Sequence, residues 1–318
     1  MSDEEKEQPA IVLDGVTAGT GSFRLGPLQA EIPRGWTTAI VGANGSGKST
    51  LFRILLGLLP VVRGKLEVLG TSVQPGVDER YKQQIGFVAE NGHPHEHSLT
   101  IAEKAAFAAF WYPGWDDQHY RRLLKRFGID EKMKLGKLSK GMRRKAELVI
   151  VMAHLPNLLL LDEPTSGLDP IVWKMWLEEM QGYMANGNKT LLIATHVTEE
   201  VRRLADHVLF LHQGRFIAQY EKDRLFDEWR ELLVRGPSDA DKSEVEALRL
   251  LAGVSGVCQA AREGQDGYRV QVNGASEGRT PEVLLQACGF QVLESRRMEL
   301  EDILSCMIRK EDANVEPA

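Results

Sequence analysis

The sequence lacks any apolar run long enough to cross a membrane. Its longest uncharged apolar run, residues 148–161, is interrupted by His154, Pro156 and Asn157, whereas a bilayer needs about 20 apolar residues. The amino terminus, Met-Ser-Asp-Glu-Glu-Lys-Glu, has no apolar core of the kind found in signal peptides. We therefore expect any connection to a membrane to run through a partner.

Cysteine is scarce and basic charge is not in excess. Cys258, Cys288 and Cys306 lie far apart without the spacing of metal ligands, which favours a reduced, cytosolic setting. The net charge is −6 and the pI is about 5.8, which argues against nucleic acid as a partner. With 318 residues, 43% hydrophobic and 26% charged, the chain has the composition and length of a globular protein with a main domain and a smaller second one.

Apolar strands alternate with helical patterns over most of the chain, which predicts an α/β fold with a mostly parallel sheet. A stretch with three helical patterns, about residues 99–154, interrupts this alternation and reads as a helical insert. The expected strands are residues 11–13, 23–28, 37–41, 65–69, 85–88, 158–162, 190–194 and 207–211, and a helix is expected over residues 48–59.

A polar, turn-rich stretch at residues 235–239 predicts a domain boundary after a helix expected over residues 226–234. The first domain then covers residues 10–234, and residues 1–9 read as a disordered acidic tail. Residues 235–318 are expected to form a small C-terminal α+β domain. Its expected helices are residues 243–251 and 281–288, and its expected strands are residues 268–273 and 291–294.

A glycine-rich segment between an expected strand and an expected helix has the spacing of a phosphate-binding loop. Glycines let the backbone wrap an anion with its N–H groups directed inward, the helix start adds a favourable dipole, and the lysine reaches the outer phosphates. A serine after the lysine supplies a hydroxyl ligand for Mg²⁺. A chance glycine turn before a lysine is the alternative, and the strand–loop–helix context disfavours it. The residues concerned are Gly42, Asn44, Gly45, Ser46, Gly47, Lys48, Ser49 and Thr50.

Two adjacent carboxylates follow four consecutive leucines at residues 158–161. A buried strand delivers such residues to the carboxyl edge of a parallel sheet, where ligands bind. Asp162 is expected to hold Mg²⁺ and Glu163 to act as general base toward an attacking water. The alternative interpretation is a pair of solvated acidic residues at a strand end, and a phosphate loop in the same sheet disfavours it.

Three further elements narrow the class of protein. Ser139 is suited to cap a helix that begins with Lys140-Gly141-Met142. Asp169 closes the segment Ser166-Gly167-Leu168-Asp169 after the acidic pair, and His196 follows the strand at residues 190–194. A lone histidine there is more often structural than catalytic, but this position is expected to lie near a terminal phosphate.

The order of these five motifs, over about residues 10–234, resembles the ATP-binding subunits of ABC transporters. The resemblance implies ATP and Mg²⁺ as cofactors and a head-to-tail dimer with two ATP molecules at its interface. Ser139 and Gly141 would then contact the γ-phosphate held by Lys48 of the other subunit. Asp169 would belong to the loop that links the two sites, and His196 would sense the γ-phosphate.

The sequence departs from the family pattern at several positions. Lys140 and Met142 alter the usual Leu-Ser-Gly-Gly-Gln signature, and Glu90 stands where the family has a glutamine. Glu90 can still offer an oxygen to Mg²⁺, as a charged ligand. The family's adenine-stacking aromatic residue is not in place, since its position falls near Gly19, and Phe23 is the available substitute.

Two clusters in and before the helical insert have alternative interpretations. His93, His95 and His97 form either a metal site or, with more support, a polar loop facing a partner. Five aromatic residues are expected mostly in the core of the insert, with some lining a groove for a short helix of a membrane subunit. They are Phe107, Phe110, Trp111, Tyr112 and Trp115.

Short segments at residues 298–304 and 111–116 resemble those of bacterial ABC-2-type exporters for antibiotics and peptides. We therefore expect the ATP-hydrolysing subunit of an ABC exporter, cytoplasmic and peripheral on the inner face of the membrane, where it binds separate integral permease subunits. A single set of motifs favours a dimer of like subunits over one of unlike subunits. The alternatives are an ABC ATPase acting on ribosomes or DNA, and a small-molecule kinase built on the same loop.

Overall fold

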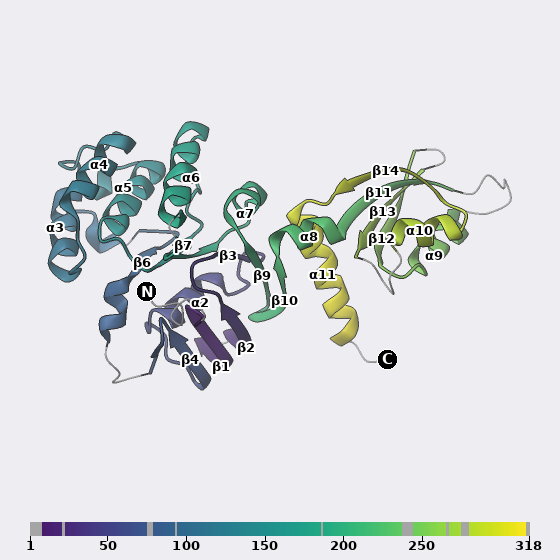
Figure 1. Ribbon diagram of the computed structural model, residues 1–318, viewed down its shortest axis with the longest axis horizontal. Helices are drawn as coiled ribbons and strands as arrows, with labels where there is room; N and C mark the ends of the chain where they lie inside the picture. Colours follow the sequence, from purple (N-terminus) through teal and green to yellow (C-terminus); the bar gives the residue numbers. More distant parts are fainter. Residues whose placement is uncertain are drawn as a thin grey trace. The chain divides into compact units, whose positions relative to one another are not determined.

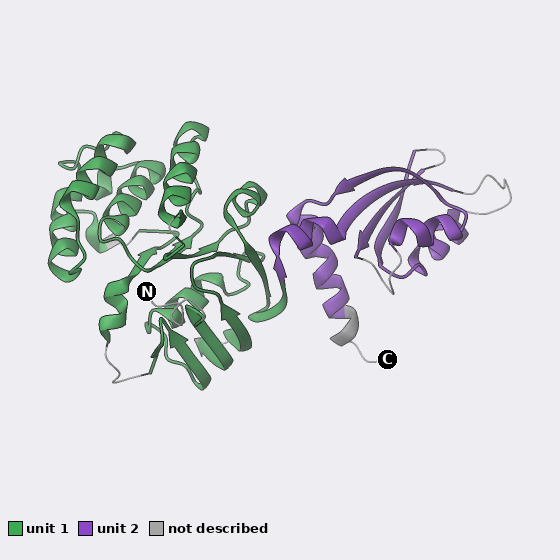
Figure 2. Ribbon diagram, in the orientation of Figure 1, with its two compact units in different colours: residues 1–219 green, residues 220–318 purple. Residues whose placement is uncertain are grey.

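The computed structural model describes residues 8–20, 23–74, 79–92, 94–185, 187–236, 244–264, 267–274 and 280–315. Most of the expected acidic tail, residues 1–7, lies outside these ranges. Contacts divide the chain into two compact units, residues 1–219 and residues 220–318 (Figure 2). Within the described ranges, no helix has both the length and the apolar character that a membrane span requires.

The first unit is built on a six-stranded sheet, which confirms the expected α/β class. The strands from β9 to β6 pair in parallel. Every residue of β3, β7 and β8 is buried, as is usual where both faces of a parallel sheet are covered. In spatial order the strands are β10 (Arg215–Glu221), β9 (His207–His212), β3 (Thr37–Val41), β8 (Thr190–Ala194), β7 (Leu158–Asp162) and β6 (Ile85–Val88).

A smaller antiparallel sheet lies beside helix α2 (Lys48–Leu55) in the same unit (Figure 1). Phe52 and Ile54 of α2 share one buried core with Leu13 and Leu28 of this sheet and with Leu160 of β7. The helix is therefore held between the two sheets, and its first residue is fixed at the edge of the large one. The strands in order are β2 (Phe23–Ile32), β1 (Ile11–Thr20), β4 (Arg63–Val68) and β5 (Thr71–Ser72).

Three helices form the insert, as expected from the sequence, and Figure 1 shows them grouped together. The first begins at a capping box, in which Thr100 and Glu103 satisfy each other's backbone N–H groups. Asp116 and Ser139 cap the second and third with their side-chain oxygens. The helices are α3 (Ile101–Trp111), α4 (Asp117–Phe127) and α5 (Lys140–Met152), with short 3₁₀ turns η1 (Glu79–Gln84), η2 (Pro94–Glu96) and η3 (Leu135–Lys137); α6 (Pro170–Met184) and α7 (Thr198–Leu204) follow along the chain.

The second unit is an antiparallel sheet with two helices on one face (Figure 1). Leu251 and Leu285 of these helices share a buried core with Leu232 and Val234 of the sheet. The sheet order is β12 (Val257–Glu263), β13 (Gly267–Asn273), β11 (Trp229–Arg235) and β14 (Gln291–Arg297), and the helices of the unit are α8 (Lys222–Glu228), α9 (Glu244–Ala252), α10 (Pro281–Ala287) and α11 (Leu300–Val315).

The helix expected over residues 226–234 is wrong, because residues 229–235 form strand β11. This strand pairs with β13 on one side and β14 on the other, and such central pairing overrides a local helical pattern. It also explains why the compact units meet at residues 219 and 220, whereas the sequence places the boundary at residues 234 and 235.

Candidate nucleotide site

The glycine-rich loop joins β3 to α2, and two of its glycines have no room for a side chain. A Cβ atom on Gly42 would lie 2.2 Å from the carbonyl oxygen of Leu211. Gly47 precedes α2 with a φ of 113°, and a Cβ there would lie 2.6 Å from Leu25 Cδ1. The loop therefore needs glycine both for its left-handed backbone and for its close approach to neighbouring segments.

Four neighbouring parallel strands end at one edge of the large sheet, and each delivers a functional segment there. The glycine-rich loop follows β3, His196 follows β8, Asp162 ends β7 with Glu163 directly after it, and Glu90 follows β6. Because these strands lie side by side in the order β3, β8, β7, β6, segments far apart in the sequence meet at the carboxyl edge, where α/β folds bind ligands.

A cavity of about 550 Å³ opens at this edge. It contains most of the site residues expected from the sequence, together with Phe23 and Ser166. Phe23 Cζ would lie 3.1 Å from a Cβ atom on Gly47, so its ring packs against the glycine-rich loop. The lining residues are Phe23, Asn44, Gly45, Gly47, Lys48, Ser49, Thr50, Glu90, Asp162, Glu163, Ser166 and His196.

The carboxylate of Glu163 lies between two basic side chains. Its Oε1 atom is 3.8 Å from Lys48 Nζ and its Oε2 atom is 2.8 Å from His196 Nδ1. The Glu163 side chain is only 9% exposed, whereas that of His196 is 64% exposed. Lys48 Nζ also donates to the carbonyl of Gly42 at 2.7 Å. The two carboxylate oxygens of Glu163 are thus oriented by Lys48 of the glycine-rich loop and by His196, which follows strand β8.

Asp162 and Ser49 present oxygen atoms side by side in the cavity. Burial raises the pKa of Asp162, and a hydrogen bond from Ser49 opposes that rise. In the described residues, no group of three His, Cys, Asp or Glu side chains is arranged to hold a metal ion by itself. This donor set still suits Mg²⁺, which typically takes one or two carboxylates and completes its shell with phosphate and water oxygens.

Comparison with known proteins assigns the family. Residues 25–166 match the ABC transporter family model. An uncharacterized ABC transporter ATP-binding protein of Bacillus subtilis, YhaQ, is 29% identical over 92% of this chain and 94% of its own. The Nod factor export ATP-binding protein I of Bradyrhizobium diazoefficiens is 33% identical over 69% of this chain and 72% of its own. A solved structure, the ATP-binding subunit of an ABC transporter, covers 69% of this chain and 92% of its own with a TM-score of 0.62 and 29% identity.

The chain belongs to the ATP-binding subunits of ABC transporters. It therefore binds ATP and is an ATPase, which confirms the expected enzyme class. Among solved ATP-binding cassettes of the same fold, one is dimeric with ADP and phosphate bound, and another is part of an ABC transporter complex. The named relatives are transporter proteins, so the alternative of a ribosome or DNA factor gains no support from them.

The ABC signature residues Ser139 and Gly141 are not among the residues that line the described cavity. Ser139 is exposed and accepts a hydrogen bond from the Met142 N–H at 3.3 Å, which caps α5. Asp169 is likewise outside the cavity and accepts hydrogen bonds from two N–H groups at the start of α6. The roles expected for these three residues concern a second subunit and stay predictions.

The structure bears differently on the expectations for the histidine cluster and for the aromatic residues of the insert. His93 lies outside the described residues, and the described residues His95 and His97 belong to no metal-binding group. The expectation that most of the aromatics are core is wrong, because Phe107, Phe110 and Trp111 are 72%, 88% and 46% exposed. Their exposure follows from their position on the outer face of α3, while Ala105 and Ala108 face inward.

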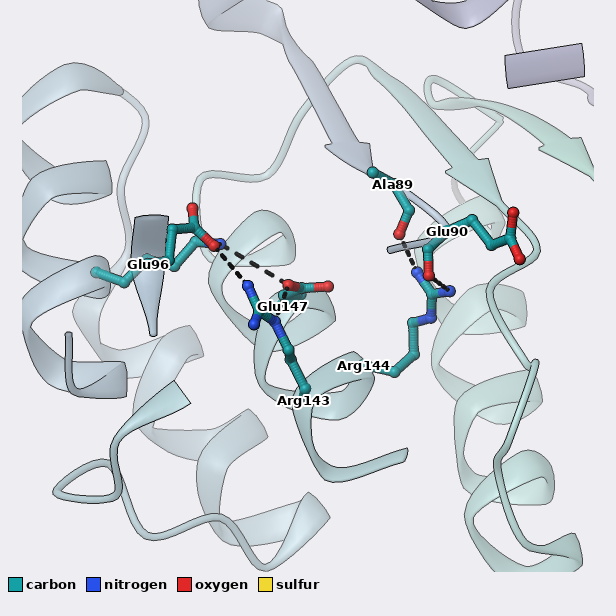
Figure 3. Close-up of polar contacts among 7 residues, drawn as sticks. Ala89, Glu90, Glu96, Arg143, Arg144 and Glu147 are labelled. Atoms are coloured by element: carbon teal, nitrogen blue, oxygen red, sulfur yellow. Dashed lines mark hydrogen bonds and ion pairs between the residues drawn. The ribbon is translucent and has the colours of Figure 1, made fainter. Parts of the chain in front are cut away.

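An apolar groove of about 670 Å³ runs beside α3 and α5. Phe87, Leu99, Phe107, Trp111 and Tyr112 contribute its apolar surface. Glu96, Lys104 and Glu147 also line it, and Lys104 bonds Glu96 at 2.8 Å. Arg143 bonds both Glu96 and Glu147 at 3.0 Å (Figure 3). Phe107, Trp111 and Tyr112 therefore line a groove, and the expectation that it receives a helix of a membrane subunit stays a prediction.

Sequence reasoning missed two buried charged residues behind the site, Arg144 and Glu200. Arg144 is 4% exposed and Glu200 is 1% exposed. Burial raises the pKa of Glu200 to about 7, although hydrogen bonds from Thr165 and Thr195 favour its charged form. The pattern around Arg144, Arg143-Arg144-Lys145, gives no signal by which one basic residue of three would be singled out.

Proposed function

We propose that this chain is the motor of an ABC exporter, with Glu163 as the general base of ATP hydrolysis. The observation that carries the proposal is the Glu163 carboxylate, buried between Lys48 and His196 at the edge of the cavity. A carboxylate in this position can accept a proton from a water that attacks the γ-phosphate. The Nod factor export relative supports export as the direction of transport.

The other residues of the cavity would bind and orient the nucleotide. The backbone N–H groups of residues 42–50 and Lys48 would hold the phosphates at the start of α2. His196 would contact the γ-phosphate, and the ring of Phe23 would stack on the adenine. Most of the rate enhancement would come from charges held in position, as in phosphoryl transfer generally.

Ser49 and Asp162 would hold Mg²⁺, with Glu90 as a third oxygen donor from the neighbouring strand. When bound, Mg²⁺ neutralises charge on the β- and γ-phosphates. The burial of Asp162 and its hydrogen bond from Ser49 support this assignment, because a partly desolvated carboxylate gains from a neighbouring cation.

The complete site would need two subunits. Ser139 and Gly141 are accessible at the start of α5 and lie outside the cavity of their own chain. In a head-to-tail dimer they would face the nucleotide of the partner subunit, and Asp169 would lie in the segment that links the two sites. We infer a dimer of like subunits, because one chain carries a full set of motifs.

The groove beside α3 would bind a short cytoplasmic helix of a separate permease chain, which would place the protein on the inner face of the membrane. Exposed aromatic side chains at an apolar groove are typical anchors for an amphipathic helix. Phe107 at 72% and Trp111 at 46% exposure fit this role. Glu96 and Lys104, which line the groove and form a salt bridge, offer charged contacts to the same helix.

Replacement of the base tests the proposal. The Glu163→Gln variant is expected to bind ATP with nearly unchanged affinity and to hydrolyse it at least about 100-fold more slowly. Binding is measured with a fluorescent ATP analogue and turnover by phosphate release, with Glu178→Gln on the exposed side of α6 as control. Undiminished turnover of Glu163→Gln would refute the assignment of the base.

The two-subunit site has a separate test, in which the ATPase activity per milligram of wild-type protein should rise with protein concentration. Constant specific activity in a monomeric sample would refute the two-subunit site.

A further inference from the structure

Arg144 occupies an unusual position for a positively charged residue. It lies on α5 and is 4% exposed, and it points away from Arg143, whose guanidinium lies beside Glu96 and Glu147 (Figure 3). Burying a charge is costly unless it is well paired and hydrogen-bonded. The groups that bond the Arg144 guanidinium should therefore indicate its role.

The guanidinium of Arg144 donates to three main-chain carbonyls behind the nucleotide site. It bonds the carbonyl of Ala89, that of Glu90 at 2.7 Å and that of Glu163 at 3.2 Å. These carbonyls follow the paired ends of β6 and β7, where Val88 lies opposite Leu161. Beyond those ends the strands no longer satisfy each other's polar groups, and the guanidinium of one arginine supplies donors to three carbonyls instead.

Glu163 needs such support because its backbone is in a conformation that glutamate disfavours. Its φ is +47°, in the left-handed region, and non-glycine residues persist there only when their surroundings hold them. Its N–H donates to the carbonyl of Ala194 at 2.9 Å. Its carbonyl accepts from Arg144 and from the Ser166 N–H at 3.2 Å. The direction of the Glu163 side chain therefore depends on the Arg144 contact.

We propose that Arg144 is a positioning residue for ATP hydrolysis. By bonding the main chain of Glu163 and of Ala89-Glu90 together, it fixes the carboxylates of Glu163 and Glu90 relative to each other and to α5. Burial lowers the pKa of Arg144, and the charges of the nearby carboxylates oppose that fall; they belong to Glu147, Asp162, Glu90 and Glu163. This inference rests on the proposed function, because it needs Glu163 to act in hydrolysis.

The test compares Arg144→Gln, Arg144→Lys and a matched control in the full-length chain. The control is Lys145→Gln, which removes the same charge from the adjacent residue of α5, where Lys145 donates to the carbonyl of Phe127 at 3.4 Å. Arg144→Gln is expected to lower kcat about tenfold or more, because small displacements of reacting groups cost that much. The dissociation constant of a fluorescent ATP analogue should change less than about twofold. Lys145→Gln should match the wild type.

Arg144→Lys separates charge from geometry. A lysine ammonium keeps the charge but cannot bridge three carbonyls as a planar fork does, so its kcat should lie between those of wild type and Arg144→Gln. Thermal melting checks that each variant is folded. If Arg144→Gln does not fold, Arg144→Lys decides: a wild-type kcat in that variant would overturn the proposal.

The double variant shows whether Arg144 acts through Glu163. In the Glu163→Gln background, Arg144→Gln should cause a much smaller loss of turnover than in the wild type, since effects of residues that act as a unit are not additive. An equal loss in both backgrounds, or a parallel loss of nucleotide affinity, would reduce Arg144 to a structural residue. Wild-type turnover of Glu163→Gln would instead refute the base itself. Loss in Glu163→Gln without loss in Arg144→Gln would overturn this inference alone.

Discussion

Glu200 should make the first unit less stable as the pH rises, and its replacement by glutamine should remove that effect. Its side chain is 1% exposed in α7, and Thr165 donates a hydrogen bond to it. Burial raises its pKa from 4.5 to about 7. A carboxyl with a raised pKa binds its proton more tightly in the folded chain than in the unfolded one, so stability falls as the pH rises between these two values.

The magnitude follows from the two pKa values. Each unit of pKa difference corresponds to about 1.36 kcal/mol, so full ionisation of Glu200 removes about 3 kcal/mol of stability. Part of that loss is already present at about pH 5, and about 2.5 kcal/mol of it develops between about pH 5 and pH 8.5. In a domain of about 200 residues, 1 kcal/mol corresponds to roughly 2–4 °C in Tm. The loss should therefore lower Tm by roughly 5–10 °C.

Calorimetric melting of the wild type and of Glu200→Gln at both pH values isolates this contribution. Other groups titrate equally in the two chains, so only the difference between their Tm values matters. That difference should grow by roughly 5–10 °C in favour of Glu200→Gln at the higher pH. The control is Glu199→Gln, the neighbouring residue, whose side chain is 46% exposed. A difference that stays constant with pH would show that Glu200 has the same pKa in the folded and the unfolded chain.

Two further predictions concern substitutions in the first unit. Burial lowers the pKa of His154 to about 4, so the folded chain should lose stability as the pH falls below about 6.5. His154→Phe keeps an aromatic ring in the stack on Tyr112, whose ring centroid is 3.8 Å from that of His154. It should remove up to roughly 3 kcal/mol of this acid sensitivity, measured as a smaller fall in Tm between about pH 7 and pH 4. Phe23→Ala should raise the Kd of ATP about tenfold, because a base–aromatic stack contributes roughly 1–3 kcal/mol; fluorescence titration measures it, and an unchanged Kd would contradict the adenine contact.

The nucleotide cavity could be predicted because its residues are encoded locally. Two apolar runs, residues 37–41 and the four leucines before Asp162, each indicate a buried strand. The first run leads into the glycine-rich loop and the second into the acidic pair. Parallel strands in one sheet then bring these ends together without further information. The cavity contains most of the residues expected from spacing alone, from Asn44 to His196.

The parts that could not be predicted depend on pairing between distant segments. Residues 229–235 become a strand because β13 and β14 flank them, and nothing in Trp-Arg-Glu-Leu-Leu-Val-Arg forbids a helix. Phe107 and Phe110 have the spacing of core residues, yet the packing of α3 leaves them exposed. Local patterns carry propensity, and tertiary contacts decide the outcome.

Arg144 depends both on locally encoded elements and on contacts between distant segments. The sequence specifies a helix that begins at Ser139, and it specifies strands that end at Val88 and Asp162. Only the fold shows that the second turn of that helix reaches the carbonyls beyond both strand ends. The same helix carries the signature serine at its start, outside the cavity. A displacement of α5 by a partner subunit would therefore act on the carboxylates of its own chain as well as on the partner's nucleotide, and this is why the hydrolysis rate, more than nucleotide affinity, should respond to substitutions at Arg144.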